Sequence, residues 1–92
     1  MRLNQKEITI IKNTIGEYLG KGEIYIFGSR LDENRRGGDI DIFFRPSMKV
    51  EYEDILLTRS YLKRRLLKPV DLVVEGFAAN SIVLEALKGV KI

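Results

Sequence analysis

The stretch FGSRLDENRRGGDIDIFF, residues 27 to 44, decides the fold and raises the functional question. Its second half alternates. One face of the strand carries Asp39, Asp41 and Phe43, and the other carries Ile40, Ile42 and Phe44. Two carboxylates on one face repel each other and resist burial, and a sequence selected only for stability would avoid them. The pattern predicts that a cation is bound there.

Helices are predicted on both sides of this stretch. Apolar residues recur at helical spacing over residues 5–19, 51–68 and 78–88, which predicts three amphipathic helices. A further short helical segment is predicted over residues 29–33, beginning at the serine of a Gly-Ser pair. The apolar stripe of the second long helix is predicted to consist of Tyr52, Ile55, Leu56, Leu62 and Leu66.

Strands are predicted between these helices. β-Branched and aromatic residues dominate residues 23–27, 39–45 and 70–75, which predicts three strands. The element order is then α-β-(short α)-β-α-β-α. This order predicts an α/β (α+β) fold in one domain, residues 1–92, built on a small three-stranded sheet.

Composition excludes several classes of chemistry. The 92 residues contain no cysteine and no histidine, which removes thiolate nucleophiles, Ser-His-Asp triads and Cys/His zinc sites. No apolar run has the roughly 20 residues of a membrane helix, and the N-terminal residues do not resemble a secretion signal, so we expect a cytoplasmic protein without a membrane partner. Carboxylates, hydroxyls, amines and backbone groups remain for catalysis.

A third aspartate extends the predicted cation site. Asp39 and Asp41 lie about 6.6 Å apart along a strand, so their carboxylates can converge on one ion or bridge two. Asp71 is the second residue of the next strand and joins them if the two strands are neighbours. Oxygen ligands select Mg²⁺ or Mn²⁺, and without histidine Asp71 is the best candidate to accept a proton.

The Gly28-Ser29 pair is the second candidate site. Glycine lets the backbone approach a ligand, serine caps a helix and offers a hydroxyl, and a helix N-terminus attracts an anion. Arg30 adds positive charge to the same loop, as do Arg35 and Arg36. These features predict a phosphate cradle.

Each motif has a simpler alternative. A Gly-Ser pair is commonly a turn with a helix cap, and a strand-edge aspartate is commonly just solvated. The three motifs in sequence are more specific for a functional site than any one of them alone. FGSR follows one strand, two aspartates begin the next strand, and one aspartate lies at the start of the third.

The segments FGSR, GGDIDIFF and VDLVV resemble the motifs of the polymerase-β-type nucleotidyltransferase superfamily, in its minimal nucleotidyltransferase group. The resemblance implies a mixed sheet and transfer of a nucleoside monophosphate from an NTP to a hydroxyl with two metal ions. It also implies that Asp39 and Asp41 are metal ligands and that Asp71 is a third ligand and the base. Gly28, Ser29 and Arg30 would contact the triphosphate.

The resemblance also implies a partner. Larger members hold the acceptor in an additional domain, which has no counterpart here, so we expect the acceptor hydroxyl to come from another macromolecule. Minimal members resemble antitoxins of HEPN-type ribonucleases, which implies AMP transfer from ATP to such a protein.

Two other functions stay open. A non-catalytic antitoxin would work by masking its partner. A nucleic-acid-binding module is less favoured, because no stacking aromatics interleave with the basic run at residues 63–65. The sequence leaves open whether the chain forms a homo- or a hetero-oligomer.

Overall fold

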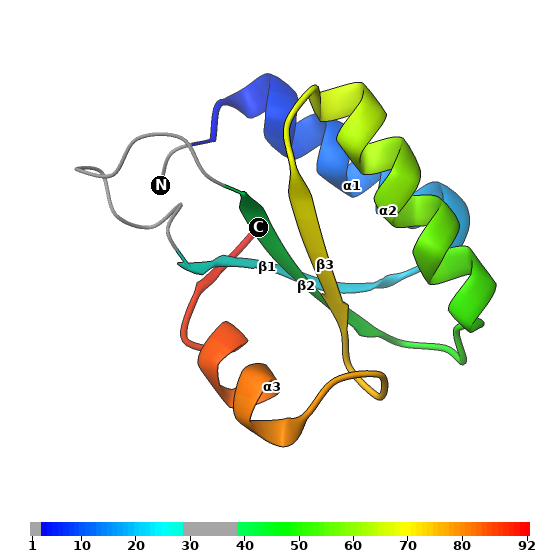
Figure 1. Cartoon of the computed structure of the whole chain (residues 1–92), viewed down its shortest axis with the longest axis vertical. Helices are drawn as coiled ribbons and strands as arrows, with labels where there is room; N and C mark the ends of the chain where they lie inside the picture. The colour runs from blue at the N-terminus through cyan, green and yellow to red at the C-terminus, as the bar shows by residue number, and fades with distance from the viewer. Residues whose placement is uncertain (1–2, 29–38) are drawn as a thin grey trace.

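The computed structural model describes residues 3–28 and 39–92, which contain both helices and strands (Figure 1). In chain order the elements are α1 (Gln5–Leu19), β1 (Gly22–Phe27), β2 (Ile40–Pro46), α2 (Tyr52–Leu66), β3 (Val70–Val74), α3 (Asn80–Ala86) and β4 (Val90–Lys91). The mixed α and β architecture predicted from the sequence is confirmed. The short helical segment predicted over residues 29–33 lies outside the described residues.

The four strands form one mixed sheet in the order β3-β2-β1-β4. β1 pairs antiparallel with both β2 and β4, whereas β2 and β3 are parallel. A parallel pair needs a crossover connection, and α2 supplies it. β3 and β4 therefore form the two edges.

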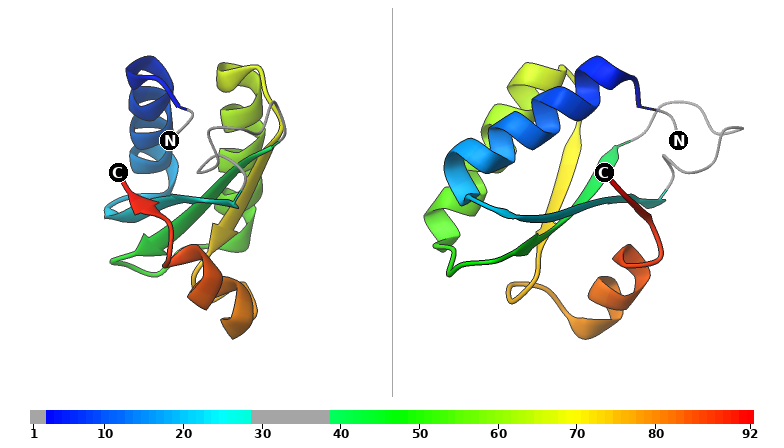
Figure 2. Two further views of the ribbon diagram at one scale, coloured as in Figure 1. Left: turned by 90° about the vertical axis from the view of Figure 1, so that its left-hand side faces the viewer. Right: turned by 180° about the vertical axis from the view of Figure 1, so that it is seen from behind.

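The two faces of the sheet are covered unequally. Figure 2 shows α1 and α2 side by side on one face and the short α3 on the other. Ile40, Ile42 and Phe44 of β2 belong to the main core on the α1 and α2 side. Phe43 points to the opposite side, where its ring lies 6.0 Å from that of Tyr25, and it is also fully buried. The alternation predicted for residues 39–45 thus describes both faces correctly.

The ends of α1 have local sequence causes. Asn4 accepts a hydrogen bond from the Glu7 amide at 2.8 Å, and the Glu7 carboxylate accepts one from the Asn4 amide at 3.2 Å. This capping box satisfies two amides that a helix start leaves without partners. The helix ends at Gly20, whose φ of 82° suits glycine.

The predicted apolar stripe of α2 is only partly right. Ile55, Leu62 and Leu66 are buried, but Tyr52 and Leu56 are exposed. Thr58 is buried in their place. Its hydroxyl donates to the Asp54 carbonyl at 2.6 Å within the same helix, so burial leaves no donor unsatisfied.

The prediction of three strands was one short, because β4 has two residues and shows no alternation. The Ile92 amide donates to the Ile24 carbonyl at 2.9 Å, which extends the β1 and β4 pairing. The Lys91 ammonium lies 2.9 Å from the Glu23 carboxylate. This hydrogen bond and its charge hold the pKa of Glu23 below its ordinary value and raise the pKa of Lys91.

An aromatic and arginine cluster joins α1 to α2. The rings of Tyr18 and Tyr61 stack with centroids 5.0 Å apart and planes 7° apart. The Arg65 guanidinium lies 5.1 Å from the Tyr61 centroid, pairs with Glu17 at 3.6 Å and donates to the Thr14 hydroxyl at 3.0 Å. These rings stack on each other and on the arginines of the basic run, and they hold the two helices together.

Candidate active site

The parallel pairing of β2 and β3 brings two of the predicted site residues together. In its register Asp41 lies opposite Asp71, and on its other side Asp41 lies opposite Phe27 of β1. Neighbouring strands lie about 4.8 Å apart, so the two carboxylates start from adjacent backbone positions on the same face. The condition set from the sequence, that the second and third strands are neighbours, is met.

Asp39 sits just before β2 and is exposed, Asp41 is half-buried, and Asp71 is exposed. Within residues 3–28 and 39–92, no group of three or more acidic, histidine or cysteine side chains is gathered closely enough to hold a metal ion. The donor chemistry nevertheless fits Mg²⁺ or Mn²⁺, because carboxylate oxygens are the ligands these ions prefer. The three-aspartate metal site therefore stays a prediction.

Gly28 is pressed against one of these carboxylates. It follows β1 directly and has a φ of +73°, a conformation that side chains rarely adopt. A Cβ atom placed on it would collide with Oδ2 of Asp41 and lie 3.1 Å from the Asp41 Cγ. The glycine is needed here for both its backbone angle and the close approach. The turn at Gly28 and the Asp41 side chain therefore pack directly against each other.

The remaining predicted contacts of this loop fall outside the described residues. Ser29 and Arg30, together with Arg35 and Arg36, lie between residues 28 and 39. Their predicted contacts with a triphosphate stay predictions.

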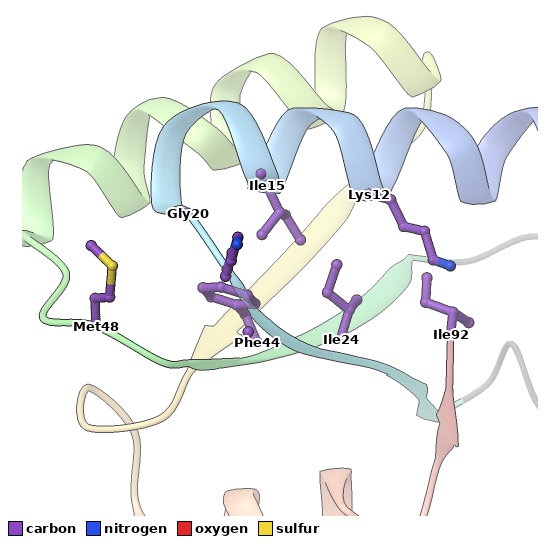
Figure 3. A pocket seen from close by; sticks show the side chains of 10 residues that line it. Lys12, Ile15, Gly20, Ile24, Phe44, Met48 and Ile92 are labelled. Atoms are coloured by element: carbon purple, nitrogen blue, oxygen red, sulfur yellow. The ribbon is translucent and has the colours of Figure 1, made fainter.

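A large hollow lies elsewhere in the molecule. A cavity of about 740 Å³ lies between α1 and the sheet. Figure 3 shows Ile15, Ile24 and Phe44 along it and Lys12 and Met48 at its margins. Its lining comes from the sheet face that carries α1 and α2, and the aspartates lie on the opposite face. No predicted site residue lines it, and it offers no carboxylate or hydroxyl side chain. Chemistry, rather than size, places the candidate active site at Asp41 and Asp71.

A comparison with protein families agrees with the fold described above. The family model described as polymerase beta, nucleotidyltransferase matches residues 3–92. The chain belongs to this nucleotidyltransferase family. Among curated proteins, no relative of this nucleotidyltransferase is matched.

Solved structures share the fold of this nucleotidyltransferase. A mutant toxin–antitoxin complex containing MntA matches with 25% identity and a TM-score of 0.75, over 95% of this chain and 69% of the other. A toxin–antitoxin with AMP-PNP matches with 24% identity and a TM-score of 0.76, over 95% and 69%.

A third structure with this fold is a tri-AMPylated HEPN toxin of Shewanella oneidensis in complex with its MNT antitoxin. It matches at 22% identity and a TM-score of 0.76, over 95% of this nucleotidyltransferase and 68% of the other chain. A separate finding concerns membranes. In the part of our chain that the structure describes, none of the helices has the length and hydropathy that crossing a bilayer requires.

Proposed function

We propose that this chain transfers AMP from an NTP, in the first instance ATP, to a hydroxyl of a HEPN-type protein and acts as antitoxin to that protein. Membership of the nucleotidyltransferase family supports the reaction class. The similar structures support the nucleotide and the partner, because one contains AMP-PNP and another contains an AMPylated HEPN toxin. Such a reaction uses the ATP of the cytoplasm, where we expect the protein to act.

The register of Asp41 against Asp71, with Gly28 packed on Asp41, is the observation that carries the proposal. Adjacent carboxylates beside a glycine turn suit a site that binds a nucleoside triphosphate together with divalent cations. Asp39 and Asp41 would hold two Mg²⁺ or Mn²⁺ ions, with Asp71 as a third ligand. These ions would neutralise phosphate charge and polarise the α-phosphate.

The protein residues have separate tasks in the proposed reaction. The acceptor oxygen forms a bond to the α-phosphorus while the bond to the bridging oxygen of pyrophosphate breaks, and pyrophosphate leaves. The proton of the acceptor hydroxyl passes to the carboxylate of Asp71. Gly28, Ser29 and Arg30 would orient the triphosphate through backbone, hydroxyl and guanidinium groups.

Labelled ATP tests the proposal. The chain is incubated with ATP, Mg²⁺ and its HEPN-type partner, and the partner is analysed by mass spectrometry for AMP on a tyrosine, serine or threonine. We expect Asp71→Asn to abolish transfer while ATP still binds. Asp39→Asn together with Asp41→Asn should abolish both transfer and metal-dependent ATP binding.

Asp54→Asn is the matched control, because Asp54 lies in the first turn of α2, away from the starts of β2 and β3. It should leave transfer unchanged. If the single and the double site variant both neutralise the partner as well as the wild type, and no AMP is found on the partner, the chain is instead a masking antitoxin without catalytic activity.

A further inference from the structure

The outer edge of β3 has backbone groups available for another strand. The Ile40 amide donates to the Pro69 carbonyl and the Glu75 amide donates to the Phe44 carbonyl, both at 3.0 Å. Backbone groups alternate in direction along a strand, so the groups of residues 69, 71, 73 and 75 face β2. Those of Val70, Leu72 and Val74 face away from it, and of these the Val74 carbonyl already accepts a hydrogen bond from the Phe77 amide at 3.0 Å. In the described ranges, β2 is the strand that pairs with β3, and no second strand pairs with it.

A groove with both apolar and polar walls runs beside this edge. Tyr52 and Leu56 of α2 are 56% and 40% exposed, and Phe77, after β3, is 49% exposed. The rings of Tyr52 and Phe77 stack with centroids 6.2 Å apart. Together with residues of β3 that include Leu72, they line a hollow of about 170 Å³. Apolar side chains of an added strand would contact these exposed rings and Leu56, and its polar groups would meet the polar part of the wall.

The other end of the groove is basic. Arg59 lines the hollow, and Lys63 lies one turn further along the same side of α2. None of the ion pairs found within residues 3–28 and 39–92 involves either side chain. Because α2 leads into β3, this basic end lies toward the start of β3, where Asp71 sits. An acidic residue on a bound segment would complement the positive charge at this end of the groove.

We infer that an extended segment of the HEPN-type partner binds here as a fifth strand, paired with β3. Its apolar side chains would fill the groove at Tyr52, Leu56 and Phe77, and an acidic side chain would meet Arg59. The inference rests on the proposed function and adds the docking site to it. An added strand lies about 4.8 Å from β3, which brings a hydroxyl side chain on it within reach of Asp71.

Amide hydrogen exchange tests the pairing residue by residue. The exchange of the chain is measured by NMR alone and with saturating partner, without nucleotide. The amides of Leu72 and Val74 should slow by about tenfold or more on binding, because they gain strand partners. The amides of Asp71 and Val73 face β2 and serve as internal controls, since they are protected already.

Affinity measurements test the groove. Leu56→Asp should weaken partner binding by about tenfold or more. Leu57→Asp is the matched control, since Leu57 is 43% exposed on the same helix but does not line the groove. Arg59→Glu should weaken binding as well, because it reverses the charge that meets the acidic side chain. A thermal melt of each variant confirms that it is folded.

Unchanged exchange at Leu72 and Val74, or equal effects of the two leucine variants, would overturn the inference. So would protection of the same amides in the chain alone at high concentration, which would make this edge a contact between two copies of the chain. Binding is measured without ATP, so a partner that docks as described but receives no AMP counts against the proposed function and leaves the docking site standing.

Discussion

Replacing Gly28 by alanine should damage both stability and nucleotide binding, for two separable reasons. The φ of +73° places this residue in a region where a non-glycine residue costs about 1 to 2 kcal/mol. For a domain of this size, that cost lowers Tm by about 4 to 16 °C. The added Cβ must also displace the Asp41 carboxylate, which it would otherwise overlap.

The second effect is functional if Asp41 is a metal ligand. Moving a ligand or its support typically reduces metal affinity about 10- to 100-fold, and we expect a loss of that size in the affinity of Gly28→Ala for ATP with Mg²⁺. Titration calorimetry measures the affinity, and a thermal melt measures the stability. Both experiments use the same protein preparation.

Gly20→Ala is the control that separates the two effects. Gly20 has a φ of +82°, but a Cβ placed on it meets nothing within 4 Å. With its ψ of −156°, Gly20 lies in a region that is essentially reserved for glycine, so Gly20→Ala should lower Tm at least as much and leave ATP affinity unchanged. The reasoning is refuted if both variants lose similar stability and both still bind ATP and Mg²⁺ as the wild type does.

Three further predictions concern α1 and the β4 edge. Gly16 is exposed within α1 and has room for a Cβ, so Gly16→Ala should raise the free energy of unfolding by about 0.5 to 1 kcal/mol in urea titrations. Asn4→Ala removes the helix cap and should lower it by about 1 kcal/mol, by the same measurement. The hydrogen bond to Lys91 lowers the pKa of Glu23 in the folded protein. The ionised pair therefore stabilises the fold at pH values above the ordinary pKa of glutamate, and this stabilisation is lost as the pH falls through the lowered pKa of Glu23. Glu23→Gln should therefore be less stable than the wild type at pH 7, and melts well below pH 4.5 should show no difference.

Patterns that depend on neighbouring residues were predictable from the sequence. The helix over 5–19 has its bounds as predicted, since its capping residues and its terminal glycine lie in the sequence itself. The alternation of residues 39–45 placed Asp41 and Phe44 on their correct faces, because the side-chain period of a strand is two. In contrast, β4 is too short to show a period, and its pairing depends on Ile24 and Glu23 from a distant part of the chain.

Burial on α2 depended on packing that the sequence does not reveal. Leu56 is apolar and lies at helical spacing, but it faces the groove beside β3 and is exposed. Thr58 is polar, yet its hydroxyl finds an acceptor within its own helix and can be buried. At the site, the approach of Asp41 to Asp71 followed from one assumption, the adjacency of two strands. The contact between Gly28 and Asp41 needed the backbone itself.

The stacked pair of tyrosines supplies a built-in optical reporter. The sequence has four tyrosines and no tryptophan, so the near-ultraviolet spectrum is not dominated by indole absorption. Tyr18 and Tyr61 come from different helices, and their nearly parallel rings lie close enough for their electronic transitions to couple. The resulting circular dichroism signal depends on the relative placement of α1 and α2. Docking of these helices can therefore be followed during folding without a label.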